Sequence, residues 1–445
     1  MSNYSIPNVE LTSHPAARSQ ARATQAISAG SIIISVPAFA FALLDAEKGQ
    51  RCDVCFRRSH ETRHLKKCTG CASYYYCDAD CQMVHWNMEH KRICRIYNKM
   101  DALVGSRQLA QHERMDVLLL SHFLARIGPR APTDSDKATS GDDEPLSTFV
   151  SLLPGPNSPS QIVDMIPRSL NRQQELTRKI YARFHNNNFT VHSHMTTIGH
   201  GVFPLASRLF NHSCMPNAAP RYILTPAKPP LMEVVALRDI DIGEEVCVPY
   251  LDPALTQARH QIFQYTYGFI CECNSCTALR SLSPIPEVPQ SQDAVVTIGE
   301  ALRHYAGMEK TLGQALPAPS LVNLPVTLRC ALHESYMEQL SGQFSKAAHE
   351  GQYSIAIESG ATLLVLYLLI YPRNYPQIGL HLLELAKTRW NALISSAAPS
   401  EAAEAEAQVR VTLSHARQIL AVYGREGDEN GPLDELQNLE GLLDE

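Results

Sequence analysis

Closely spaced cysteines and histidines between residues 52 and 94 form the strongest chemical pattern in the chain. The pairs are Cys52-x2-Cys55, Cys68-x2-Cys71, Cys77-x3-Cys81 and His90-x3-Cys94. Thiolates and imidazoles are the ligands that zinc prefers, and a closed structural site takes four of them. An x2 pair chelates an ion from a tight turn, and an x3 pair lies on one face of a helix. The eight ligands therefore predict two structural zinc sites.

Spacing alone leaves the last pair of ligands open. Cys81-x3-His85 offers the same geometry as His90-x3-Cys94, and His60 and His64 also lie in the segment. Few large side chains are available there for a core: Tyr74, Tyr75, Tyr76, Trp86 and Ile93. A core this small depends on bound metal for its stability, so we expect zinc to be required for folding of the module.

A second cysteine cluster lies later in the chain. Its three thiolates are one ligand short of a closed structural site and stand at Cys271, Cys273 and Cys276. The fourth ligand must come from elsewhere, and the unassigned cysteines are Cys214, Cys247 and Cys330. Cys214 lies in a distinctive polar segment, and its ligation would tie two distant parts of the chain together. Cys247, in a strand-like run, and Cys330, in a predicted helix, are expected to be buried packing residues.

The composition is that of a soluble globular protein with more than one domain. The 445 residues are 44% hydrophobic and 19% charged. A net charge of -6 gives no general attraction to nucleic acid or to an anionic membrane. Basic side chains gather between Arg51 and Lys99, whereas the tail from Glu426 to Glu445 is acidic. Nucleic-acid binding by the basic zinc module is the weaker interpretation, because its aromatic residues are needed for the core.

No signal peptide is evident at the N-terminus. The longest apolar run, Ala361 to Tyr371, is about half of the roughly 20 residues that cross a bilayer, so we expect a buried helix and no membrane association. Thirteen cysteines without a secretory signal indicate a reducing compartment, where paired cysteines bind metal. The expected localisation is the nucleus, the cytoplasm or both.

Local patterns predict a mixed first part and a helical last part. Residues 31–36 and 233–237 are predicted strands, and residues 111–127 and 161–183 are predicted helices. Polar or proline-rich breaks lie at residues 128–144, 279–293 and 316–325, and only the second is expected to be a domain boundary. After Asp293 nearly every segment has helical length and composition.

Two motifs in the middle of the chain resemble the paired signature of SET domains. They are Asn211-His212-Ser213-Cys214-x-Pro216-Asn217 and Gly243-Glu244-Glu245-Val246-x-Val248-Pro249-Tyr250. The zinc segment resembles the MYND finger, and its position inside the SET domain resembles the SMYD family. Residues 23–30, 187–190, 199–204 and, more loosely, 367–387 also resemble segments of that family.

The resemblance implies an α+β fold, in which a MYND zinc finger splits a β-rich SET domain and a TPR-like all-α domain ends the chain. The implied parts are an N-terminal SET part (1–51), the finger (52–94), a helical insert (95–186), the core SET domain (187–252), a post-SET zinc region (253–280) and the helical domain (290–445). Interleaved ligation is also implied. One zinc would take Cys52, Cys55, Cys77 and Cys81, and the other would take Cys68, Cys71, His90 and Cys94; His85 would not be a ligand.

The resemblance implies a protein lysine methyltransferase that uses S-adenosylmethionine and holds three Zn2+. Methyl transfer from a sulfonium to an amine needs a neutral, aligned and dehydrated lysine, and a narrow aromatic channel favours that state. Tyrosine suits such a channel, because its ring excludes water while its hydroxyl orients the amine. The family assigns this role to Tyr250 and Tyr267, and assigns cofactor contacts to Asn187, Asn211, His212, Tyr250 and Phe269. The expected protein is a monomer that binds a substrate lysine in a histone or another protein.

One segment departs from the family pattern. Family members carry Gly-x-Gly before the first strand, near the cofactor, where this chain has Arg18-Ser19-Gln20. Glycine tolerates close approach and positive φ, which arginine and glutamine do not. Weakened or lost cofactor binding motivates the alternative hypothesis, a catalytically silent adaptor whose zinc module and helical domain bind partner peptides.

Overall fold

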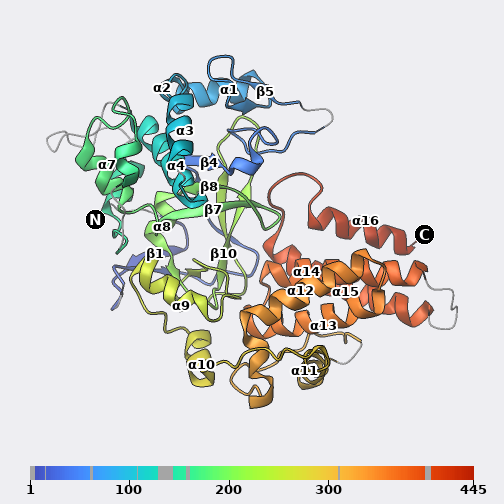
Figure 1. The fold of residues 1–445 in the computed structure, drawn as a ribbon. Helices are drawn as coiled ribbons and strands as arrows, with labels where there is room; N and C mark the ends of the chain where they lie inside the picture. The colour runs from blue at the N-terminus through green and yellow to red at the C-terminus, as the bar shows by residue number, and fades with distance from the viewer. Residues whose placement is uncertain are drawn as a thin grey trace.

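Figure 1 shows the fold of the computed structural model, with the zinc-ligand region at the top and the last helices at the lower right. The structure describes residues 6–15, 17–60, 64–107, 109–128, 144–156, 161–308, 311–395 and 402–444, without the side chain of residue 161. The polar stretch predicted at 128–144 therefore lies, from 129 to 143, outside the described residues. The expected α+β class with a helical C-terminal part is confirmed.

Strands from both ends of the first half complete the same antiparallel sheets. In one sheet β3 (Ile32–Pro37) pairs with β11 (Leu231–Ala236), which also pairs with β10 (Ala218–Ile223). In the other, β8 (Thr196–Val202) lies between β4 (Ala40–Leu43) and β7 (Asn188–Ser193). Because segments before and after the zinc-ligand region share these sheets, that region is an insertion into one domain.

Short strand pairs bring the motif segments together. β1 (Val9–Thr12) pairs with β2 (Gln20–Ala23). β9 (Asn211–His212) pairs in parallel with β12 (Cys247–Val248), with Asn211 opposite Cys247 and His212 opposite Val248. The two signature motifs, separated in sequence, therefore lie side by side. η1 (Asp45–Glu47), a short 3-10 helix, follows β4 and leads into the zinc-ligand region.

The inserted region consists of a small hairpin and a series of helices. The hairpin is β5 (Lys66–Lys67) with β6 (Tyr75–Tyr76), followed by α1 (Ala79–His85), a π-helical turn η2 (Trp86–His90) and α2 (Lys91–Ile93). The helices after it are α3 (Tyr97–Ser106), α4 (Gln111–Ile127), α5 (Glu144–Ser151), α6 (Gln161–Met165) and α7 (Gln174–Tyr181). They share one buried apolar cluster with the finger, so finger and insert form a single packed body.

The single helix predicted over residues 161–183 was wrong. The structure has α6 and α7 with an interruption between them. Pro167 follows the end of α6; a proline lacks an N–H donor and disfavours helical geometry in the residue before it. The spacing of apolar residues favoured one helix, but the proline ends the first helix and leaves two.

Helices after the core SET strands carry the late cysteine cluster. They are α9 (Ala258–Ile262), a π-helical turn η3 (Phe263–Tyr267) and α10 (Asn274–Leu282); α8 (Pro204–Leu209) precedes the first SET motif. The loop after α10 leads to α11 (Gln292–Tyr305), within the predicted boundary segment.

The C-terminal domain consists of helices that pack in succession. They are η4 (Val326–Leu332), α12 (Glu334–His349), α13 (Tyr353–Ile370), α14 (Pro376–Ser395), α15 (Ala402–Tyr423) and α16 (Pro432–Asp444). Neighbouring pairs from α12 to α16 contact one another. Prolines make the sharp turn between α13 and α14: Pro372 lies after the end of one helix and Pro376 is the first residue of the next.

One described helix, α13, is long and apolar enough to cross a membrane by length and composition. The helix lies in the core of the helical domain, and 61% of its apolar window is buried. A buried core helix of a globular domain passes the same test, so this helix by itself is weak evidence for a membrane span.

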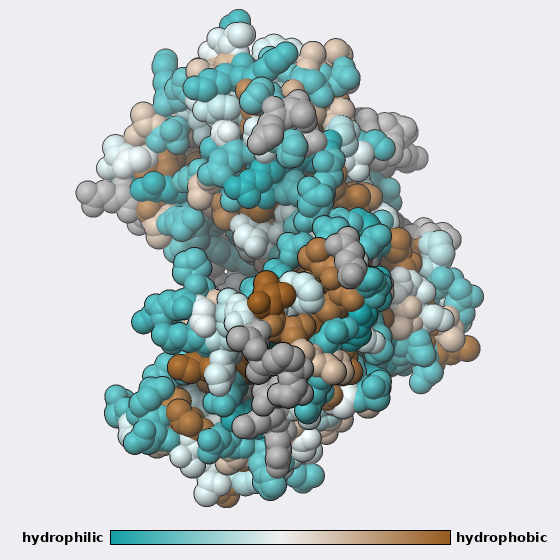
Figure 2. Space-filling model, turned by 90° about the vertical axis from the view of Figure 1, so that its right-hand side faces the viewer, coloured by the Kyte–Doolittle hydropathy of each residue, from teal (hydrophilic) through white to brown (hydrophobic). Residues whose placement is uncertain are grey.

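The loop after α15, residues 424–431, returns to the first half of the chain and will be called the clasp. Gly427 N–H donates to the Tyr222 carbonyl at 2.7 Å, and Glu426 contacts His192 Nδ1 at 3.0 Å. Asp428 accepts from Arg51 Nη1 at 2.5 Å and from the Arg58 backbone N–H at 3.0 Å. Figure 2, which turns the right-hand side of Figure 1 to the viewer, shows a mostly hydrophilic face with hydrophobic residues gathered toward its middle. The clasp thus ties the helical domain to both the SET sheets and the zinc finger.

Glycine is required within the clasp. Gly427 has a φ of +68°, and a Cβ there would lie 2.2 Å from Ser193 Oγ.

Burial raises the pKa of Asp428, but hydrogen bonds from the Arg58 backbone N–H and the Arg51 guanidinium lower it by more, so the net shift is downward. The carboxylate is therefore held in its ionised form.

We expect Asp428→Ala to lower the free energy of unfolding by about 2–4 kcal/mol, because it removes one of the two carboxylate partners of the largely buried Arg51 guanidinium, the other being Glu47. Urea denaturation measures the change. Since the folded pKa of Asp428 is lowered, its contribution is complete above about pH 4 and is lost as pH falls through the folded value. Glu429→Ala is the matched control, because this neighbouring side chain is 66% exposed and its loss should cost under about 1 kcal/mol. Equal effects of the two variants would contradict the interpretation.

Candidate metal and methyl-transfer site

The finger brings its eight predicted ligands into two groups of four. Cys52, Cys55, Cys77 and Cys81 form one group, and Cys68, Cys71, His90 and Cys94 form the other. In each group the ligand atoms all lie within 4.8 Å of one another. Cys55 and Cys77 Sγ are 3.6 Å apart, and Cys68 and Cys94 Sγ are 3.8 Å apart. A tetrahedral zinc with Zn–S of about 2.3 Å separates its sulfurs by about 3.8 Å, so both groups fit zinc.

Local structure aims the ligands inward. The Asp78 side chain accepts from the Cys81 N–H at 2.8 Å and so fixes the first turn of α1, which carries that ligand. Gly70 lies between the two ligands of an x2 pair, and a Cβ there would be 2.7 Å from Cys94 Sγ. A glycine is therefore needed where the chain passes closest to the second metal group.

His85 lies outside both groups, so the structure does not use the Cys81-x3-His85 pairing that spacing left open. Its Nε2 contacts Glu89 Oε1 at 3.4 Å, and its Nδ1 lies 3.1 Å from the Tyr76 hydroxyl. His90 instead lies 3.7 Å from Cys71 Sγ and 3.3 Å from Cys68 Sγ. The two rings stack with their centroids 5.0 Å apart, but His90 contacts the sulfurs whereas His85 contacts Glu89.

The late cysteines gather with Cys214. Its Sγ lies 3.5 Å from Cys276 Sγ and 4.0 Å from Cys271 Sγ, and Cys273 completes a group whose sulfurs all lie within 4.8 Å. Neither Cys247 nor Cys330 is part of it. All described cysteines are free thiols, so the donor set is four sulfurs available to a soft metal. The segment after the SET core is thereby joined to the first signature motif.

Arg259 is a residue of this site that the sequence did not reveal. The side chain is fully buried, and it donates to the Pro253 carbonyl at 2.9 Å and to Ser275 Oγ at 3.0 Å. Hydrogen bonding to Cys271 raises the pKa of Cys214, whereas the positive charge of Arg259 acts in the opposite direction and favours the thiolate. Its only sequence signal is a position twelve residues before Cys271 in a short helix, which does not identify it.

The His212 ring connects the thiolate group with the predicted channel. The Tyr250 backbone N–H donates to His212 Nδ1 at 3.0 Å, and His212 Nε2 lies 3.1 Å from Cys214 Sγ. Since Nδ1 accepts, Nε2 carries the proton and donates to the sulfur. Hydrogen bonds of this kind orient metal ligands and adjust their basicity. Both ring nitrogens are thus engaged within the protein, and only the backbone of His212 is left for a ligand.

Tyr250 and Tyr267 lie next to one another in an aromatic group, with their rings tilted by 33°. Their ring centroids are 5.0 Å apart, and Tyr250 Oη donates to the Phe210 carbonyl at 2.7 Å. Phe269 lies 6.1 Å from Tyr267 and 6.0 Å from His212. Burial raises the pKa of Tyr267 to about 12, and burial also raises that of Tyr250. Both phenols therefore stay protonated near neutral pH and serve as hydrogen-bonding groups rather than as bases.

Phe263 completes this group and was missed by sequence reasoning. The side chain is fully buried, 4.4 Å from the His212 ring and stacked on Phe269 at 5.1 Å. Its position four residues before Tyr267 in a helical turn is the signal that could have indicated a shared face.

Asn211 and Asn187 are both held by hydrogen bonds from their side-chain amides. Asn211 Nδ2 donates to the Ser19 carbonyl at 2.8 Å and to Glu245 Oε1 at 2.7 Å, so its two amide protons are used and its Oδ1 is left to accept. Asn187 is buried, and its Nδ2 donates to the Arg183 carbonyl at 2.9 Å.

The segment that replaces Gly-x-Gly is held by side-chain contacts. Arg208 Nη1 donates to Ser19 Oγ, Arg18 Nη1 donates to the Ser151 carbonyl, and buried Gln20 begins β2. None of Arg18, Ser19 and Gln20 has a positive φ. The backbone here adopts conformations open to any residue, so the absence of glycine causes no strain.

A cleft of about 400 Å³ lies between the SET and helical domains. Asn187, Tyr250 and Tyr267 line it from one side, and Tyr375 and Tyr423 line it from the other. Residues of the helical domain therefore form one wall of the space that the channel tyrosines face.

The model of the SET domain matches residues 20–251. This chain belongs to the SET domain family. The N-lysine methyltransferase SMYD2-B of Xenopus laevis is 28% identical over 297 residues, which cover 62% of this chain and 64% of the relative. Human N-lysine methyltransferase SMYD2 is 28% identical over 301 residues, which cover 62% and 63%. The match thus spans somewhat less than two thirds of these relatives, and the expected resemblance to the SMYD family is confirmed.

A solved structure, the SET domain of LSMT bound to lysine and AdoHcy, matches with a TM-score of 0.24 and 12% identity over 98% of this chain and 87% of that one. A likeness at that level carries no argument about this chain.

We expect Cys214→Ala to reduce bound metal by one ion per chain, because three sulfurs cannot close a structural site. Elemental analysis of purified protein measures the stoichiometry. Cys247→Ala is the matched control, since Cys247 lies in the same SET core but outside the sulfur groups. Equal metal content in wild type and Cys214→Ala, or a loss in the control, would contradict the assignment.

Proposed function

We propose that this SET domain protein is a protein lysine methyltransferase that uses S-adenosylmethionine. The observation that carries the proposal is the adjacent pair of Tyr250 and Tyr267 that lines the cleft, with the His212 ring 5.3 Å from that of Tyr250. The N-lysine methyltransferase names of its relatives support the same function.

The residues around the aromatic group fit the cofactor. The Phe269 ring offers a stacking surface for adenine, and Asn211 Oδ1 with the backbone of His212 offers hydrogen bonds. Buried Asn187 has an amide that lines the cleft next to Tyr250. Unstrained backbone at Arg18–Gln20 is compatible with contacts through main-chain groups. The cofactor would supply an electrophilic methyl group.

The channel residues would prepare the lysine. A free lysine has a pKa near about 10.4, and aromatic walls that exclude water disfavour its ammonium form. Tyr250 and Tyr267 stay neutral because burial raises their pKa values, so neither adds a negative charge that would hold the ammonium. The Tyr250 hydroxyl is fixed by the Phe210 carbonyl, which keeps its position constant for alignment of the amine.

The substrate proposed for the cleft is a lysine side chain of a protein, carried by a histone or another protein. Asp252 lines the cleft, where a carboxylate favours approach of a cationic side chain before it is dehydrated. Three expectations stay predictions: localisation in the nucleus, the cytoplasm or both, a monomeric state, and peptide partners of the finger. The second candidate function, a silent adaptor, is motivated by Arg18-Ser19-Gln20 in place of Gly-x-Gly.

Calorimetric titration of the metal-loaded protein with S-adenosylhomocysteine separates the two functions. We expect saturable one-site binding, weakened about 10-fold by Phe269→Ala because an adenine stacking contact is lost. Ile270→Ala is the matched control, since the adjacent Ile270 is 68% exposed and should not affect binding. No binding by folded wild type would contradict the methyltransferase and favour the adaptor.

We expect Tyr250→Phe to bind S-adenosylhomocysteine like wild type and to transfer methyl groups about 100-fold more slowly, because the amine loses its aligned hydroxyl. Radiolabelled methyl transfer to a lysine-rich protein mixture measures the rate. Tyr265→Phe, in the helical turn that carries Tyr267, is the control, because Tyr265 is 60% exposed. Unchanged transfer by Tyr250→Phe would remove Tyr250 from the proposed mechanism.

A further inference from the structure

Two histidines and a glutamate form a buried group between the finger and the helical insert. His85 and Glu89 come from the finger, His122 comes from α4, and all three side chains are almost fully buried. Glu89 Oε1 lies 3.4 Å from His85 Nε2 and 2.5 Å from His122 Nδ1. The three ligand atoms lie within 4.8 Å of one another, as the ligand atoms of the thiolate groups do.

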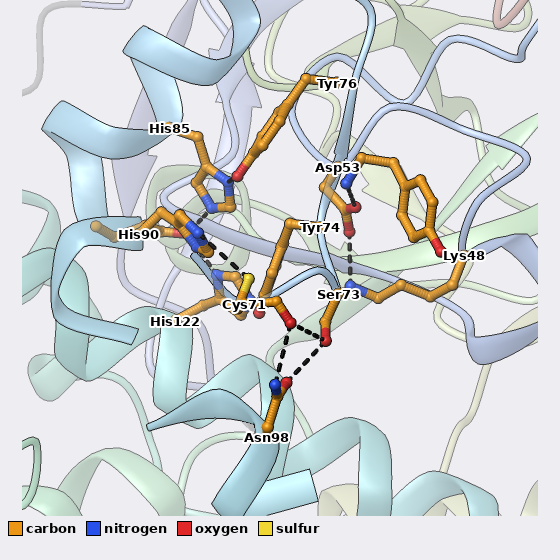
Figure 3. A network of polar contacts seen from close by, with 12 residues as sticks. Lys48, Asp53, Cys71, Ser73, Tyr74, Tyr76, His85, His90, Asn98 and His122 are labelled. Carbon is orange, nitrogen blue, oxygen red and sulfur yellow. Dashed lines mark hydrogen bonds and ion pairs between the residues drawn. The ribbon is translucent and has the colours of Figure 1, made fainter. Parts of the chain in front are cut away.

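Two tyrosines orient the imidazoles. The Tyr76 hydroxyl lies 3.1 Å from His85 Nδ1, and the Tyr74 hydroxyl lies 2.9 Å from His122 Nε2. Figure 3 shows both histidines gathered beside these tyrosines and His90. Each ring therefore uses one nitrogen on a tyrosine and turns the other toward the same carboxylate. Metal-binding histidines are held in this way, with the second nitrogen engaged by an outer group.

Two polar atoms at the centre of the group make no hydrogen bond to the described residues, although both side chains are 0% exposed. They are Glu89 Oε2 and His85 Nε2, and the latter has only its 3.4 Å contact with Glu89 Oε1. An unpaired buried polar atom costs roughly 1–3 kcal/mol, and a buried carboxylate needs a compensating positive charge. The nearby cation Lys48 is already paired with Asp53 at 2.6 Å.

We propose that His85, Glu89 and His122 form a fourth metal site, for a divalent ion of the zinc class. Two imidazole nitrogens and one carboxylate oxygen supply three ligands, as in zinc sites that keep a fourth position open, and imidazole with carboxylate suits zinc. Ligand atoms about 2.0–2.1 Å from a tetrahedral ion lie about 3.3 Å apart, close to the His85–Glu89 contact. Binding lengthens the shorter His122–Glu89 contact, which in the absence of metal is a direct hydrogen bond.

The position of the site gives it a structural role. The finger is an insertion, and α4 carries His122 from the next part of the chain. An ion held by both would clamp the finger onto the insert, next to the second thiolate group, whose ligand His90 stacks on His85 at 5.0 Å. The competing occupant is a proton, which would leave a buried ion pair of Glu89 with His122.

Titration of metal-free protein with Co2+ distinguishes metal from proton. We expect four equivalents to bind: three with thiolate-to-metal charge-transfer absorption, from the three cysteine-containing groups, and a fourth with ligand-field absorption alone. Saturation at three equivalents would overturn the proposal and leave the ion pair. Elemental analysis of protein purified with its own metal provides the second count.

His122→Gln tests the assignment without altering the finger itself. We expect this variant to lose one ion per chain, and to lose only the equivalent that lacks charge-transfer absorption. Asp116→Asn is the matched control, because Asp116 lies on α4 like His122 and its buried carboxylate contacts another histidine, His185, at 3.5 Å. This variant should keep all four ions. Retention of four ions by His122→Gln would overturn the proposal. If that variant does not fold, the wild-type cobalt count decides alone.

Discussion

Four sulfurs drawn from Cys214 and the late cluster at residues 271–276 set the geometry on which the proposed site depends. Four thiolates repel one another unless positive charge lies among them, and a soft divalent metal together with the guanidinium of Arg259 would provide it. His212 then connects the group to the channel, since one ring nitrogen donates to Cys214 and the other accepts from the Tyr250 backbone. The position of Tyr250 is thus coupled to a metal site that does not contact the reacting atoms.

The same demand for compensating charge governs the finger. Its apolar side chains pack into the core that it shares with the insert, while its thiolate groups would depend on bound metal for compensating charge. The aromatic residues Tyr74 and Tyr76 do two things there. Their rings pack among the histidines, and their hydroxyls hold His122 and His85 in place. Packing and polar satisfaction are therefore inseparable in this part of the molecule.

The cleft exists because separate parts of the chain are held together. Strands from before and after the finger complete the SET sheets, and the helical domain contributes Tyr375 and Tyr423 to the facing wall. The clasp fixes this arrangement through ionic contacts such as Asp428 with Arg51 and through the close backbone approach at Gly427. Those contacts lie far from Tyr250 in sequence, yet they hold the helical domain that forms the opposite wall of its cleft.

Sequence determined the features that depend on local chemistry and spacing. The paired cysteines, the signature motifs and the period of α4 are readable because chelation and helix geometry depend on neighbours a few residues apart. Residues 161–183 show the limit of that reading, since an apolar period favoured one helix and Pro167 decided otherwise.

Only the tertiary structure decided which distant groups meet. It chose Cys214 over Cys247 and Cys330, buried Arg259 beside the thiolates, brought Phe263 against His212 and joined His122 to His85 and Glu89. The physical reason is that these contacts join segments whose separation in the chain carries no period or motif. These contacts form as the chain folds, because they compensate buried charge and fill space, and no local sequence pattern indicates them.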